Sequence, residues 1–69
     1  MYYYIFSRVG KIWAMYGVED PITNKEEAVK VARRMAEGSI AILGKDIKVM
    51  ELGICARDLK NIKFREVKI

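Results

Sequence analysis

Hydrophobic positions along the chain follow two different periods. Residues 2–8 and 11–16 are rich in aromatic and β-branched side chains, which is typical of strands, and Val9-Gly10 between them predicts a tight hairpin turn. Three later segments contain short apolar runs or alternating positions that predict further strands: residues 39–43, 47–56 and 62–69. The pattern therefore predicts a β-hairpin at the start of the chain and two or three strands towards its end.

Between the hairpin and the later strands, the period becomes that of a helix. Thr23 and Glu26 fit a capping box that begins this helix, and Gly38 suits the left-handed residue that ends it. Apolar residues recur at helical spacing and form one stripe: Ala28, Val31, Ala32, Met35 and Ala36. We therefore predict one amphipathic helix that buries this stripe.

These elements predict an α+β fold in a single domain over residues 1–69. The order is a hairpin, one amphipathic helix and two or three further strands, with an antiparallel sheet that carries the helix on one face. Residues 57–69 carry several lysines and arginines, so we expect either an edge strand or a loosely held basic tail there.

The two faces of the predicted hairpin differ in chemistry. Pairing across Val9-Gly10 places Phe6 opposite Trp13, and strict alternation then separates the side chains into two sets. The smaller, more aliphatic set is predicted to lie against the helix: Tyr3, Ile5, Ser7, Ile12, Ala14 and Tyr16. The other set is aromatic with cations at its rim, and we predict that it forms a binding surface: Tyr2, Tyr4, Phe6, Arg8, Lys11, Trp13 and Met15.

Three explanations fit an aromatic face that no helix covers. The face can pair with a second copy of the chain or with another protein, because large exposed apolar patches mark interaction sites. The C-terminal segment can cover it with Ile62 and Phe64. It can also stack nucleic-acid bases while the flanking cations contact phosphates. We favour a non-catalytic module that self-associates or binds a protein, with single-stranded nucleic-acid binding as the alternative.

Composition is consistent with a small, folded and basic protein. The chain has 69 residues, of which 52% are hydrophobic and 32% charged, and its net charge is +4. No apolar run reaches the roughly 18–20 residues that span a bilayer, and no signal peptide is evident, so we expect a cytoplasmic protein. The absence of glutamine and histidine, with many lysines, glutamates and isoleucines, resembles the composition of thermophile proteins.

The sequence lacks the residue types that most catalytic sites need. Without histidine, no catalytic triad or metal cluster built on imidazole can form. The single cysteine, Cys55, lies in an alternating apolar run that is typical of a small buried hydrophobe. Gly44-Lys45-Asp46 lacks both the spacing and the Ser/Thr of a phosphate loop. We therefore predict no catalytic residue, metal, cofactor or small-molecule substrate, and no enzymatic activity.

Several of these features together resemble a group of small proteins common in phages, prophages and related mobile elements, many of unknown function. The resemblance covers Tyr2 to about Arg57. It is carried by the aromatic first strand, the central Trp13, the helix start and the later strand: Tyr3–Phe6, Trp13, Thr23-Asn24-Lys25-Glu26-Glu27-Ala28 with Ala32 and Ala36, and Lys48–Leu52. It implies a ββα fold followed by strands and an origin in a mobile element, and it brings no active site with it.

Overall fold

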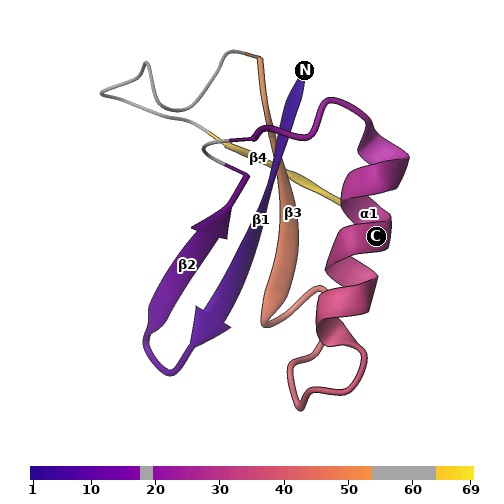
Figure 1. Cartoon of the computed structure of the whole chain (residues 1–69). Helices are drawn as coiled ribbons and strands as arrows, with labels where there is room; N and C mark the ends of the chain where they lie inside the picture. The colour runs from indigo at the N-terminus through magenta and orange to yellow at the C-terminus, as the bar shows by residue number, and fades with distance from the viewer. Residues whose placement is uncertain (18–19, 54–63) are drawn as a thin grey trace.

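The computed structural model describes residues 1–17, 20–53 and 64–69 (Figure 1). Within these residues the chain forms one helix and four strands: β1 (Tyr2–Val9), β2 (Ile12–Tyr16), α1 (Lys25–Ala36), β3 (Ile47–Leu52) and β4 (Arg65–Val67). The strands form one antiparallel sheet in the order β2-β1-β3-β4, and α1 packs against it. The predicted α+β fold with two strands after the helix is therefore confirmed.

The predicted later strands are longer than the observed ones. Residues 39–43 do not form a strand, and only an isolated bridge joins Leu43 to Ile47. β3 ends at Leu52, and the predicted continuation of this strand and the beginning of the last one fall partly on residues 54–63, outside the described residues. The basic C-terminal segment contributes an edge strand, since β4 pairs with β3.

The hairpin turn lies one residue later than predicted. Gly10 and Lys11 form the turn, and Gly10 has a φ of 64°, which suits the first central position of a type II′ turn. Phe6 consequently lies opposite Met15 instead of Trp13. Because the pairing differs by two residues, each side chain keeps its predicted face of the sheet.

The helix begins at a different cap from the predicted one. The side chain of Asn24 accepts a hydrogen bond from the main-chain N–H of Glu27 at 3.1 Å, so Asn24, and not Thr23, is the N-cap. Asparagine is at least as good a cap as threonine, which accounts for the one-residue difference. At the other end, Gly38 has a φ of 72° and takes the predicted left-handed conformation.

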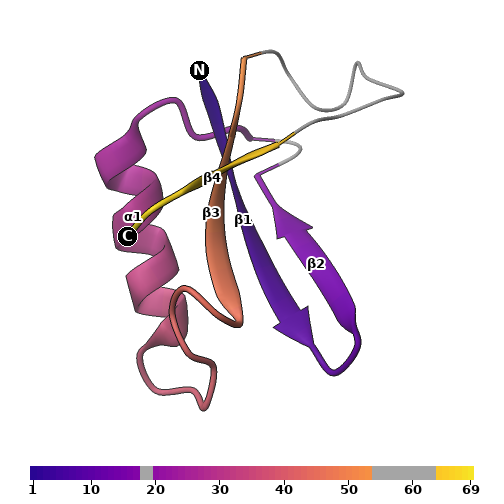
Figure 2. The ribbon, with the colours of Figure 1, turned by 180° about the vertical axis from the view of Figure 1, so that it is seen from behind.

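The helix covers β1 and β3 and leaves β2 uncovered. A core between α1 and the sheet contains seven buried residues: Tyr3, Ile5, Ala28, Ala32, Ile47, Val49 and Val67. The predicted helix-facing set is thus confirmed for β1. The prediction was wrong for β2. β3 pairs with the edge of β1 opposite to β2, and α1 packs over β1 and β3 instead of over the hairpin. Figures 1 and 2 show β2 and α1 at opposite sides of the molecule.

Candidate interaction surface

The face of the sheet opposite the helix, here called the outer face, carries a second small core. Tyr4 is fully buried there, together with Leu52. The ring of Phe64, just before β4, lies edge-on to Tyr4 and to Phe6, with centroid separations of 5.7 and 5.0 Å. Tyr2 packs against the same group. We call these five residues the outer cluster.

The outer cluster narrows the predicted binding surface. Tyr4 belongs to the protein's own packing, which corrects the expectation that its side chain is exposed. Internal coverage by the C-terminal segment is thus realised in part, by Phe64. The other residue expected to cover this face, Ile62, lies outside the described residues.

The half of the outer face nearest β2 remains exposed. Trp13 is 41% exposed and Met15 36% exposed, although both are large and apolar. Trp13 forms one wall of an open depression of about 340 Å³ whose other lining residues are Phe6, Lys48 and Met50. The sequence pointed to Phe6, Trp13 and Met15 but missed the two residues from β3. The alternating pattern of β3 predicts that Lys48 and Met50 share one face of a strand, but it does not predict that this strand lies beside β1.

Two cations flank the exposed tryptophan. The guanidinium carbon of Arg8 lies 5.7 Å and the Nζ atom of Lys48 lies 5.8 Å from the centroid of the Trp13 ring, within the range of cation–π attraction. Both cations are also paired with carboxylates. Arg8 contacts Asp46 at 2.6 Å, and Lys48 contacts Glu66 at 3.2 Å. The charges around the ring are therefore largely balanced within the protein.

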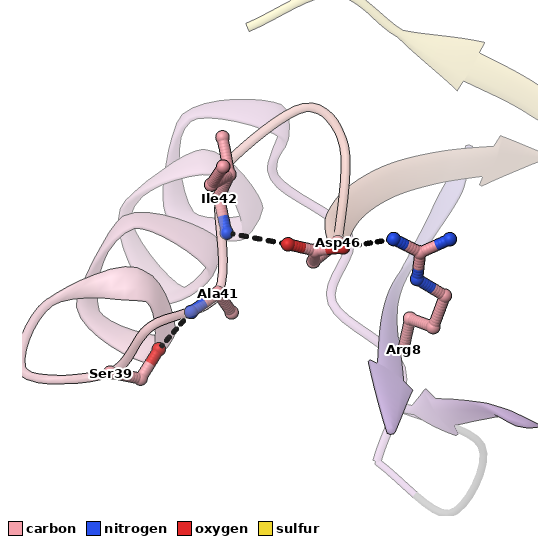
Figure 3. A network of polar contacts seen from close by, with 5 residues as sticks. All are labelled: Arg8, Ser39, Ala41, Ile42 and Asp46. Atoms are coloured by element: carbon pink, nitrogen blue, oxygen red, sulfur yellow. Dashed lines mark hydrogen bonds and ion pairs between the residues drawn. The ribbon is translucent and has the colours of Figure 1, made fainter. Parts of the chain in front are cut away.

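Asp46 connects this surface to the turn that precedes β3. Its carboxylate accepts one hydrogen bond from the main-chain N–H of Ile42 at 3.0 Å and another from Arg8 (Figure 3). The N–H of Ile42 and the guanidinium of Arg8 both favour the ionised carboxylate and lower the pKa of Asp46 below its ordinary value of 3.8. Arg8 is thus held in place beside Trp13 at neutral pH.

The helix-side face of β2 is exposed as well. Ile12 is 73% exposed and Tyr16 is 49% exposed, and the neighbouring Val9 is also exposed. Ile12 and Tyr16 belong to the set that the sequence predicted to lie under the helix. β2 therefore presents apolar side chains to solvent on both of its faces.

Two other features, a metal-binding cluster and a membrane-spanning helix, are absent from the part of the chain that the structure describes. Among those residues, no group of three or more histidine, cysteine, aspartate or glutamate side chains is placed to hold a metal ion. Within the same residues, no helix is long and apolar enough to cross a lipid bilayer. The sequence hypothesis about Cys55 lies outside the described residues.

Comparisons with known protein families, with curated proteins and with solved structures find no match to this chain. The resemblance to small proteins of mobile elements stays a prediction from the sequence. The surface around β2 is therefore interpreted from its own geometry and chemistry.

Proposed function

We propose that this protein is a non-catalytic interaction module that self-associates or binds another protein through its first hairpin. The observation that carries the proposal is the exposure of Trp13, at 41%, in the wall of an open depression. Tryptophan and arginine are enriched among the residues that dominate binding energy at protein interfaces, and methionine is enriched at interfaces generally. Trp13, Met15 and Arg8 are adjacent on this surface.

The charge distribution favours a protein partner over a nucleic acid. A nucleic-acid platform needs cations that are free to contact phosphates and a series of exposed rings on which bases stack. Here Arg8 and Lys48 already pair with carboxylates, and Tyr4 is buried. What remains exposed suits an apolar contact with a charged rim, which is the usual anatomy of a protein–protein interface.

The proposal is tested by measuring solution mass over a wide concentration range for the wild type and for Trp13→Ala. If the chain self-associates, removing a central tryptophan should cost about 2 kcal/mol or more, which raises the dissociation constant roughly 30-fold. Ile40→Ala is the matched control, because Ile40 is 101% exposed but lies outside the hairpin. Where another protein partner is available, its affinity should show the same contrast between the two variants. Equal effects of the two substitutions would contradict the proposal.

Single-stranded nucleic-acid binding is the second candidate, favoured by the position of the Trp13 ring beside the two cations Arg8 and Lys48. Lys11 is the informative residue, because it is exposed and has no ion pair with a described residue. In a fluorescence titration of Trp13 with an oligonucleotide, Lys11→Gln should weaken binding and reduce the slope of log affinity against log salt by about one. A protein interface built on Trp13 and Met15 should not show this salt effect.

A further inference from the structure

Among the described residues, no strand pairs with one of the two sides of the β2 main chain. In β1, the N–H of Arg8 donates to Asp46 on the β3 side at 2.7 Å, whereas the N–H of Tyr3 donates to Ile22 at 2.7 Å, on the edge where β2 lies. Even-numbered residues of β1 thus direct their main-chain groups to β3, and odd-numbered residues direct theirs to β2. Antiparallel pairing then fixes which residues of β2 face inwards.

Applied to the hairpin register, this alternation leaves two residues of β2 facing outwards. Ile12, Ala14 and Tyr16 lie opposite odd-numbered residues of β1 and direct their main-chain groups towards β1. Trp13 and Met15 lie opposite even-numbered residues, so their N–H and C=O groups point away from the sheet. No described strand lies on that side, because β2 ends the strand order.

This edge lacks the features that keep other edges from pairing. Proteins usually protect an edge strand with charged residues, proline, a bulge or a very short length. β4, at the other edge, has three residues and carries Arg65 and Glu66. β2 has five residues, IWAMY, with neither charge nor proline, and four of them are exposed. β2 is therefore the edge at which the sheet can be extended.

We propose that a second copy of this chain pairs antiparallel with β2 across a two-fold axis at Ala14, so that the two sheets become continuous. The inference rests on the proposed function and specifies its partner and contact. Outward-facing residues must pair with outward-facing residues, and placing Ala14 opposite Ala14 of the second copy is the register that pairs all five residues of β2. Trp13 then lies opposite Met15 of the second copy, and each such pair exchanges both main-chain hydrogen bonds.

The side chains of β2 complement each other in this register. A two-fold axis normal to the sheet keeps each residue on its own face, so Trp13 meets Met15 on the outer face, where sulfur–aromatic contact is favourable. Ile12 meets Tyr16 on the helix side, an aliphatic–aromatic pair of the kind that stabilises sheets. Lys11 lies opposite Gly17, so no like charges are opposed. All four exposed apolar residues of β2 thus gain a partner.

The size of the contact predicts a weak dimer. An interface formed mainly by one edge strand from each chain is smaller than the roughly 1,200–2,000 Å² of standard protein–protein interfaces. We therefore expect dimers that dissociate on dilution.

Disulfide trapping tests the register directly. Ala14→Cys, in a Cys55→Ser background, should link to its counterpart under mild oxidation, because residues opposed in a non-hydrogen-bonded pair have Cα atoms about 4.5 Å apart, within the usual disulfide range of roughly 4.4–6.8 Å. Ile12→Cys in the same background is the matched control. In the proposed register, position 12 of one chain lies opposite position 16 of the second copy, and position 12 of the second copy lies four residues further along, about 13 Å or more away. The Ile12→Cys variant should therefore link at least tenfold more slowly. Mixing Ile12→Cys with Tyr16→Cys should restore fast linkage between the two chains.

Amide hydrogen exchange of the wild type provides a second measurement that needs no substitution. The amides of Trp13 and Met15 should become protected as concentration rises, whereas those of Ile12 and Ala14, which face β1, should not change. Equal linkage of Ala14→Cys and Ile12→Cys, or exchange independent of concentration at Trp13 and Met15, would overturn the inference. If solution mass nevertheless shows a dimer that Trp13→Ala weakens, the proposed function stands and only the edge pairing is wrong. If the wild type is monomeric at every concentration but binds another protein through Trp13, the second copy is excluded and the module remains.

Discussion

Truncation of Phe64 tests whether the C-terminal segment holds the outer face of the sheet together. Phe64 is partly buried, and its ring lies edge-on to both Tyr4 and Phe6. Phe64→Ala removes these contacts and opens one side of Tyr4, which is fully buried in the wild type. We therefore expect a loss of stability although Phe64 lies on the face of the sheet opposite the helix-side core.

The expected loss follows from the area and the ring contacts. Phenylalanine buries about 150–250 Å² when fully enclosed, so a partly buried Phe64 removes roughly 100 Å² from water. At about 25 cal/mol per Å² this burial contributes roughly 2.5 kcal/mol, and the edge-to-face contacts add about 0.5–1.5 kcal/mol each. Their sum, about 3.5–5.5 kcal/mol, is most or all of the roughly 5 kcal/mol expected for a marginally stable small domain. The melting temperature should fall by at least about 15 °C.

The assay is urea unfolding followed by circular dichroism at low micromolar protein, where self-association contributes least. Phe64→Leu keeps most of the apolar volume but loses the ring contacts, so it should lose roughly 1 kcal/mol. Exposed Lys68→Ala should stay within about 0.5 kcal/mol of the wild type. Combining Phe64→Ala with Tyr4→Leu should give a total loss smaller than the sum of the two single losses, because both remove the same contact. If Phe64→Ala unfolds at the same urea concentration as Lys68→Ala, the outer cluster does not depend on Phe64 and the reasoning fails.

Two further predictions concern the turn before β3 and the helix contact. Asp46→Asn should have a lower melting temperature than the wild type at pH 7, where the ionised carboxylate contributes fully. The two melting temperatures should converge towards pH 2, because the wild type loses this contribution as pH falls through the lowered pKa of Asp46. A difference that persists at pH 2 would rule out the ionised carboxylate as its cause. Ala32→Leu should destabilise the fold by about 1–3 kcal/mol, since Ala32 is fully buried where α1 meets the sheet. Exposed Arg34→Ala should change stability by less than about 0.5 kcal/mol, and unfolding free energies that are equal for the two helix variants would show that α1 does not pack closely there.

The parts of the fold that were predicted from the sequence are those set by local patterns. The stripe that contains Ala28 and Ala32 predicted the helix and its buried side because both depend on spacing within one element. The two faces of the hairpin were also predicted, although the turn was placed one residue early. A two-residue difference in pairing moves neighbours but leaves Trp13 and Tyr3 on their own faces.

The parts that were not predicted depend on which strand lies beside which. β3 pairs with β1, and this long-range choice brings Lys48 and Met50 beside Trp13 and moves the helix away from β2. Likewise, the burial of Tyr4 depends on Phe64, sixty positions along the chain, lying over the outer face. No local periodicity encodes either contact. The sequence therefore pointed to the aromatic face of the hairpin but included Tyr4, which is buried, whereas Trp13 is exposed.

The exposure of β2 follows from the dimensions of the fold. A helix is about 10 Å wide and strands are about 4.8 Å apart, so one helix covers roughly two strands of a four-stranded sheet. Here α1 covers β1 and β3, while Phe64 covers part of β1 on the outer face. All five residues of β2 are apolar, and four of them are exposed on the two faces of the strand. A single Thr or Lys at position 12 would protect this edge without loss of internal packing, because Ile12 contributes little to either core. The proposed pairing with a second copy would give the exposed Ile12 a partner and make β2 an inner strand of the sheet.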